Sequence, residues 1–171
     1  TELAVVIGTR AHRIRVADAL EHVAGYAVMN DYTLRDYQRA TSQFHAGKSF
    51  YRTAGFGPWL TTSEEWGPGR GARLTTTVDG DVRQDDNTDD LIFSVAELIA
   101  FCSSLYPLNP GDVIATGTPE GVGFARGADA LLGDGSVTRI SIDGLGTIEN
   151  TTRYGEPPVH GCGDGCACHG G

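Results

Sequence analysis

Short apolar runs separated by turn-forming residues make up most of this chain. Runs of about four to eight residues that are rich in β-branched and aromatic side chains, and that end at Gly, Pro, Asn or Asp, are typical of strands. This pattern predicts strands at residues 3–7, 25–29, 57–62, 74–78, 81–84, 112–116, 138–142 and 145–150. Two of the connections, Asp79-Gly80 and Asp143-Gly144, contain the residues that tight turns favour, so we expect two β-hairpins.

Helical periodicity is confined to a few short segments. Ser94 and Glu97 form a capping-box sequence at the start of the clearest helix, residues 95–106. The expected apolar face of this helix consists of Leu98, Ile99, Phe101, Cys102 and Leu105. Residues 15–24 have apolar positions at helical spacing, and residues 33–43 are expected to form a short helix or an ordered loop. Because strands outnumber helices, we expect a mixed, β-rich α+β fold.

Length and composition indicate a soluble globular protein with one domain. The chain has 171 residues, of which 40% are hydrophobic and 20% charged, as is usual for such proteins. Its net charge of −9 argues against a nucleic acid or an anionic membrane as the partner. No apolar run approaches the roughly 20 residues that span a bilayer, and there is no signal segment, so we expect a cytoplasmic protein. The folded domain is expected at residues 1–153, followed by a disordered tail rich in Gly, Cys and His at residues 154–171.

The candidate chemistry begins with Lys48, the only lysine among the 13 Lys and Arg residues. An ammonium is a compact charge that can contact a developing negative charge, whereas a guanidinium is larger and planar. Glu2 at the start of the first predicted strand and Asp31 at the end of the second offer hard oxygen ligands for a divalent cation. Spacing alone leaves open that Glu2 is a solvated edge residue and Asp31 a turn residue.

Five motifs can be compared with known families. They are ELAVVIG at residues 2–8, AGY at 24–26, MND at 29–31 with Arg35, Asp36 and Gln38, GKSF at 47–50, and PGDVI at 110–114 running into TGTPEGVG at 116–123. Together they resemble the catalytic C-terminal domain of the fumarylacetoacetate hydrolase family. The resemblance extends from residue 2 to about residue 150. Gln84 also matches a family stretch, and we expect it to have a structural role or to lie near a dimer contact.

The resemblance implies a β-sandwich roll with a few short helices, a homodimer, and a Mg²⁺ or Mn²⁺ ion, in some members Ca²⁺, bound by three acidic residues. Glu2 corresponds to the second residue of the family's Glu-x-Glu pair, and Asp31 corresponds to the third ligand. The first ligand would fall one position before Thr1, and the family's catalytic His and Glu lie on an N-terminal lid further upstream. We therefore expect the chain to lack this upstream segment.

The resemblance also implies roles for residues around the metal. Lys48 and Gln38 correspond to catalytic residues, and Lys48 would stabilise negative charge on the substrate. Arg35, Gln38 and Thr118 correspond to residues that contact a small-molecule 2-oxo acid substrate. The family contains acylpyruvate hydrolases, 2-oxo acid hydratases, decarboxylases and enol isomerases, so the motifs indicate the site more narrowly than the reaction.

The function we expect is hydrolysis of a C–C bond in an acylpyruvate or related 2-oxo or β-diketo acid, through a metal-stabilised enolate. One alternative is an isomerase, hydratase or decarboxylase of 2-oxo-ene-dioates in aromatic catabolism. Another is a catalytically silent, truncated domain that serves as a dimer scaffold or binds a soft metal through its tail. The tail residues concerned are His160, Cys162, Cys166, Cys168 and His169.

Overall fold

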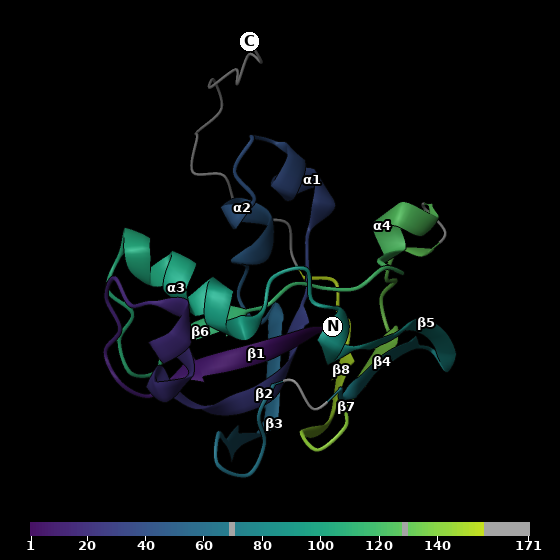
Figure 1. The fold of residues 1–171 in the computed structure, drawn as a ribbon. Coiled ribbons are helices and arrows are strands. Elements are labelled where there is room, and N and C mark those ends of the chain that lie inside the picture. The colour runs from purple at the N-terminus through teal and green to yellow at the C-terminus, as the bar shows by residue number, and fades with distance from the viewer. Residues whose placement is uncertain (69–70, 128–129, 156–171) are drawn as a thin grey trace, which may run out of the picture.

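The computed structural model describes residues 1–68, 71–127 and 130–155, which form two antiparallel sheets of four strands each (Figure 1). The first sheet has the strand order β3-β2-β1-β6, made by Ala54–Thr62, Val23–Asp31, Glu2–Ile7 and Val113–Ala115. The second has the order β5-β4-β7-β8, made by Asp81–Asn87, Arg73–Val78, Val137–Ile142 and Gly146–Thr151. All eight predicted strands are present, although β2, β3 and β5 are longer than expected and β6 is shorter. The predicted β-rich α+β class is confirmed.

The turn between β4 and β5 has the chemistry that its sequence predicts. Asp79 and Gly80 both have positive φ angles, 53° and 92°, as a two-residue hairpin turn with the twist of its strands requires. The second hairpin differs from the prediction, because Leu145 belongs to the turn and β8 begins only at Gly146. Leu145 is nevertheless fully buried, so its apolar side chain packs in the core without being part of a strand.

Short helices connect the strands. The α-helices are α1 (Arg35–Arg39), α2 (His45–Lys48), α3 (Val95–Leu105) and α4 (Gly123–Arg126), and the 3-10 helices are η1 (Val16–His22) and η2 (Thr88–Asp90). Of the apolar residues at helical spacing in the predicted helix at 15–24, Val16 and Leu20 are exposed, and the buried residue of η1 is Ala19. A 3-10 helix has about three residues per turn, so residues four apart do not share a face. Within the described parts of the chain, no helix is long and apolar enough to cross a membrane.

Helix α3 begins with the predicted capping box but buries only part of the predicted apolar face, since Ile99 is fully buried and Cys102 packs against the core. The Ser94 hydroxyl accepts a hydrogen bond from the Glu97 amide, and the Glu97 carboxylate accepts one from the Ser94 amide. Phe101 and Leu105, expected in the core, are each 63% exposed. Ser103 is buried instead, because its hydroxyl accepts a hydrogen bond from the Ile14 amide and donates one to a carbonyl of its own helix. Such a long-range partner cannot be read from helical periodicity.

The hydrophobic core is a single cluster that joins both sheets and α3. The first sheet contributes Leu3, Val5, Ile7, Tyr26 and Val28, the second contributes Leu74, Ile140, Ile142 and Ile148, and α3 contributes Val95 and Ile99. The N-terminal end of β1 reaches the second sheet, where the hydroxyl groups of Thr1 and Thr76 are hydrogen bonded to each other. Glu2, the first of the candidate site residues, follows Thr1 at this junction between the sheets. Residues 156–171, with all the cysteine and histidine residues of the predicted tail, lie outside the described part.

Candidate metal and substrate site

Strand pairing places the two predicted metal ligands on the same face of the first sheet. Glu2 on β1 lies opposite Met29 on β2, and paired residues point to the same side of an antiparallel sheet. Asp31 follows Met29 by two residues, and side chains alternate along a strand, so Asp31 projects from the same face as Glu2. The two carboxylates are therefore diagonal neighbours on adjacent strands, although Glu2 and Asp31 are 29 positions apart in the chain.

Glu2 is a buried carboxylate with one strong backbone partner. It is only 6% exposed, and its Oε2 accepts a hydrogen bond of 2.8 Å from the Gly117 amide. Burial raises the pKa of Glu2, and the charge of Asp31 raises it further, whereas the Gly117 hydrogen bond and the Lys48 ammonium act in the opposite direction. A buried carboxylate beside a second one is an unfavourable arrangement unless a cation compensates both charges.

Lys48 supplies part of that compensation. The Lys48 ammonium donates a hydrogen bond to the Asp31 carboxylate, and both side chains are largely covered. Helix α2 ends at Lys48 and packs tightly on α1, because a methyl group on Gly47 would lie only 2.6 Å from Cβ of Gln38. The Leu34 amide also donates to the Gly47 carbonyl, at 2.9 Å. The glycine before Lys48 thus permits the close approach that brings the ammonium to Asp31.

Arg35 and Gln38, both on α1, are paired with each other. Nη1 of Arg35 donates to Oε1 of Gln38 at 2.6 Å, and the Gln38 side chain is buried. The guanidinium groups of Arg35 and Arg39 lie 5.4 and 3.9 Å from the ring centre of Phe124 on α4. Among the described residues, no hydrogen bond links the Arg35–Gln38 pair to Glu2, Asp31 or Lys48. The pair adjoins them through the contact between Gln38 and Gly47.

Thr118 lies beside Glu2 because it directly follows Gly117, whose amide binds the Glu2 carboxylate. Its hydroxyl accepts a hydrogen bond of 2.9 Å from Nε2 of Gln84 on β5. Gln84 had been expected only to have a structural role or to lie near a dimer contact. Gln84 is a polar residue at a buried position of a hairpin strand, and the strand pattern by itself does not distinguish it from an exposed polar residue.

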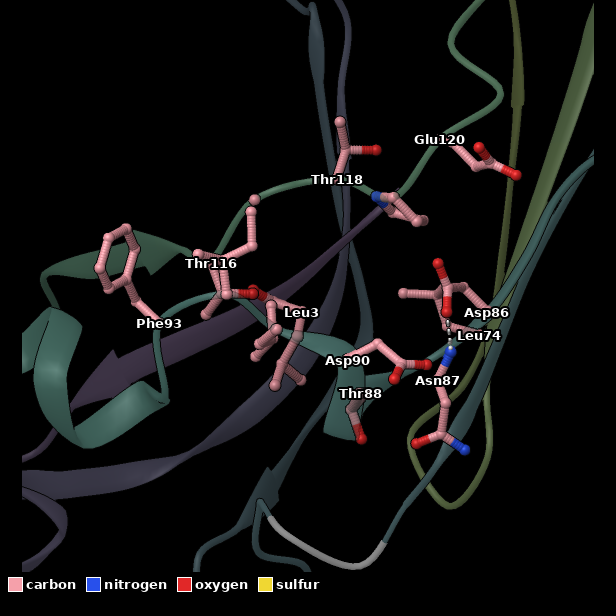
Figure 2. A pocket seen from close by; sticks show the side chains of 14 residues that line it. Leu3, Leu74, Asp86, Asn87, Thr88, Asp90, Phe93, Thr116, Thr118 and Glu120 are labelled. Carbon is pink, nitrogen blue, oxygen red and sulfur yellow. Dashed lines mark hydrogen bonds between the residues drawn. The ribbon is translucent and has the colours of Figure 1, made fainter.

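A separate pocket of about 360 Å³ lies between the segment around η2 and the loop that follows β6 (Figure 2). It is lined by Leu3, Leu74, Asp86, Asn87, Thr88, Asp90, Leu91, Ile92, Phe93, Thr116, Gly117, Thr118, Pro119 and Glu120. Thr118 is the one predicted site residue in this lining. The neighbouring Asp86 carboxyl raises the pKa of Asp90. The pocket thus adjoins the loop of Thr118 but does not contain the Glu2–Asp31–Lys48 cluster.

The donor set of this cluster fits a hard divalent cation in part. Glu2 and Asp31 supply two carboxylates on one face, and the buried Glu2 carries charge that a cation would stabilise. Across residues 1–68, 71–127 and 130–155, no three Asp, Glu, His or Cys side chains come together as a complete metal site. The remaining coordination positions would be left to water, to substrate and to a further ligand such as the acidic residue that the family resemblance puts before Thr1.

Comparison with known proteins agrees with these features. The model of the family described as fumarylacetoacetate (FAA) hydrolase, C-terminal, matches residues 1–153. The chain belongs to the fumarylacetoacetate hydrolase family, as its motifs predict. Its β-rich fold of two antiparallel sheets and a few short helices matches the folds of solved relatives.

Three relatives illustrate the range of the family. The chain is 42% identical over 149 residues to oxaloacetate tautomerase YisK of Bacillus subtilis, covering 87% of this chain and 50% of that protein. Fumarylpyruvate hydrolase of Pseudomonas aeruginosa, solved with Mn²⁺ and pyruvate, matches with a TM-score of 0.80 and 39% identity over 90% of this chain and 64% of its own. The 5-carboxymethyl-2-hydroxymuconate delta-isomerase of Mycobacterium smegmatis matches with a TM-score of 0.81 and 37% identity over 91% and 58%. The chain spans about half the length of the curated relatives it matches.

Proposed function

We propose that this chain is the metal-binding catalytic domain of an enzyme that acts on a 2-oxo acid by way of its enolate. The observation that carries the proposal is the meeting of Glu2, Asp31 and Lys48, the only lysine, on one face of the first sheet. Mg²⁺ or Mn²⁺ is the cation that the two carboxylates suit, and when bound it supplies a Lewis acid for the carboxylate and 2-oxo oxygens of a substrate.

Three residues of the chain would then bind the substrate or stabilise its charge. Lys48 presents an ammonium next to Asp31, where it can stabilise negative charge that develops on the substrate's 2-oxo oxygen. Arg35 is held by Gln38 and presents a guanidinium for a substrate carboxylate. Thr118 adds a hydroxyl on the loop whose Gly117 amide binds Glu2. Each of these groups binds or stabilises the anionic substrate, and none of them is placed as the base that would activate water.

For the overall reaction we propose hydrolysis of a C–C bond in an acylpyruvate. Support comes from the 39% identity to fumarylpyruvate hydrolase, a protein solved with Mn²⁺ and pyruvate. A second candidate is tautomerisation of a 2-oxo acid, supported by the 42% identity to an oxaloacetate tautomerase and by the fact that the cluster stabilises an enolate without supplying a base for water. Both reactions would use the two carboxylates and Lys48 to stabilise the same enolate.

One experiment separates the two reactions. The full protein that contains this chain is incubated with acetylpyruvate and, in parallel, with oxaloacetate, with and without added Mg²⁺ or Mn²⁺. Hydrolysis predicts metal-dependent loss of the enol absorbance of acetylpyruvate with equimolar release of pyruvate. Tautomerisation predicts faster enol–keto exchange of oxaloacetate, with no more pyruvate released than in the control that contains metal but no enzyme. Metal-independent traces that match the buffer control for both substrates would contradict the proposed function.

We also propose that the protein assembles as a homodimer. Ile92 and Phe93, which precede α3, are 91% and 61% exposed, and exposed apolar side chains of this size are typical of a surface that another chain covers. Sedimentation velocity over a range of concentrations tests this assembly. A mass of one chain at micromolar concentration would contradict it.

A further inference from the structure

Gln84 links the two sheets through a network in which every polar atom of its amide is used. Its side chain is 5% exposed and lies between β4 and the loop that follows β6. Oε1 accepts a hydrogen bond of 2.8 Å from the Thr76 hydroxyl. Nε2 contacts three acceptors on the loop, namely Oγ1 of Thr118 at 2.9 Å, the Pro119 carbonyl at 3.0 Å and the Glu120 carbonyl at 3.3 Å.

These partners determine which way the Gln84 amide points. The carbonyl oxygens of Pro119 and Glu120 can only accept hydrogen bonds, so the amide nitrogen must face the loop and the amide oxygen must face Thr76. Gln84 therefore donates to the Thr118 hydroxyl. Among the described residues, the Thr118 hydroxyl has only nitrogen donors as partners and no protein acceptor. Its own hydrogen is left to donate to a group outside the chain.

The loop is held in place on both sides of Thr118. On one side, the Gly117 amide donates to the Glu2 carboxylate at 2.8 Å. On the other, Gly121 has a positive φ of 97°, and a methyl group there would collide with the Arg83 carbonyl on β5. The backbone thus lies directly against β5 beside Gln84, and such restraint keeps the hydroxyl in one position before a ligand arrives.

We propose that Gln84 is a positioning residue that polarises and orients the Thr118 hydroxyl, so that Thr118 donates a hydrogen bond to the carboxylate of the 2-oxo acid. The inference rests on the proposed function for the identity of the ligand. Gln84 itself does not touch the substrate. The amide nitrogen donates to the Thr118 oxygen, so the Thr118 hydrogen points away from Gln84. The amide cannot turn over without losing its hydrogen bonds to the Pro119 and Glu120 carbonyls.

The test is a double-mutant cycle between Gln84→Glu and Thr118→Val. Gln84→Glu keeps the shape of the side chain but replaces the donor by an acceptor, which draws the Thr118 hydrogen away from the substrate. Removing a hydrogen bond to a charged group costs about tenfold or more in affinity, so we expect each single variant to raise KM, and the Kd of pyruvate measured by calorimetry in the presence of Mn²⁺, by about tenfold with a smaller change in kcat. The double variant is expected to match Thr118→Val alone, because Gln84 has nothing left to orient.

Thr138→Val is the matched control. Thr138 is buried on β7 of the second sheet, and its hydroxyl has no partner among the described residues, so the variant tests the effect of altering a buried polar group away from the loop. Unchanged pyruvate affinity in Gln84→Glu, or additive effects in the double variant, would overturn the positioning role. If pyruvate affinity depends on Gln84 but the unmodified protein turns over neither substrate, the positioning role of Gln84 stands and the proposed reaction is refuted. A parent that neither binds nor reacts refutes both.

Discussion

The ammonium of Lys48 donates a hydrogen bond to the carboxylate of Asp31, so the only lysine of the chain contacts one of the two carboxylates predicted to bind metal. The contact joins the end of α2 to the end of β2. Since Glu2 lies on the same face as Asp31, one cation from the chain and two anions share a small, partly covered volume. This contact explains why a lysine stands at position 48 in a chain whose other basic side chains are arginine.

Replacing Lys48 by Arg is expected to abolish most activity without unfolding the protein. The planar guanidinium retains the charge but cannot occupy the position of the compact ammonium, and loss of a preorganised donor of this kind lowers kcat by about 100-fold or more. Turnover is measured with the enol absorbance assay, and the fold by circular dichroism and thermal melting. Arg10→Lys, which exchanges the same two residue types at an exposed position, is the control. Near-parental turnover of Lys48→Arg would refute the argument from the single lysine.

Removing either carboxylate is expected to weaken binding of a divalent cation. Loss of a residue that merely supports a metal ligand costs about 10–100-fold in affinity, so loss of a direct ligand in Glu2→Gln or Asp31→Asn should cost at least as much. Mn²⁺ binding followed by electron paramagnetic resonance provides the measurement. Asp85→Asn serves as the comparison, because Asp85 is paired with Arg73 on the outer surface of the second sheet. Equal Mn²⁺ affinity in all three variants would mean that these carboxylates do not bind the metal.

The buried face of α3 can be tested by a pair of alanine substitutions on the same helix. Ile99 is fully buried in the core, and truncation of such a side chain lowers the free energy of unfolding by about 2–5 kcal/mol. Phe101 is mostly exposed, so Phe101→Ala should change it by less than about 0.5 kcal/mol in the isolated chain. Urea unfolding monitored by tryptophan fluorescence measures both values. A larger effect at Phe101 than at Ile99 would contradict the observed burial of Ile99 and exposure of Phe101.

Gly25 on β2 is expected to tolerate no side chain. A methyl group there would collide with the Thr61 carbonyl of β3, which is backbone and cannot move aside without disturbing the sheet. Overpacking of this kind costs about 1–3 kcal/mol, so Gly25→Ala should lower the urea midpoint clearly. Gly67→Ala is the matched control, since a methyl group on Gly67 meets no atom within 4 Å. Equal stability of the two variants would contradict the close approach of β2 and β3.

Local features of the chain were predicted well where the interactions that cause them are local. The Asp79-Gly80 turn and the Ser94–Glu97 capping box involve residues at most three positions apart, and both are present. The face of α3 was predicted less well, because Ser103 is buried through a partner at Ile14, far away in the sequence. Apolar character alone favoured Phe101 and Leu105 as the buried residues of this helix.

For the candidate site, the sequence by itself determined the residue types, since a motif records which side chains follow one another. Only the tertiary structure decided that Glu2 and Asp31 share a face, that Lys48 contacts Asp31 and that the Gln84 amide points at Thr118. The physical reason is one of range. Turn chemistry and strand alternation act over a few residues, whereas the contact between Gln84 and Thr118 depends on how two sheets pack, and packing is a property of the whole chain.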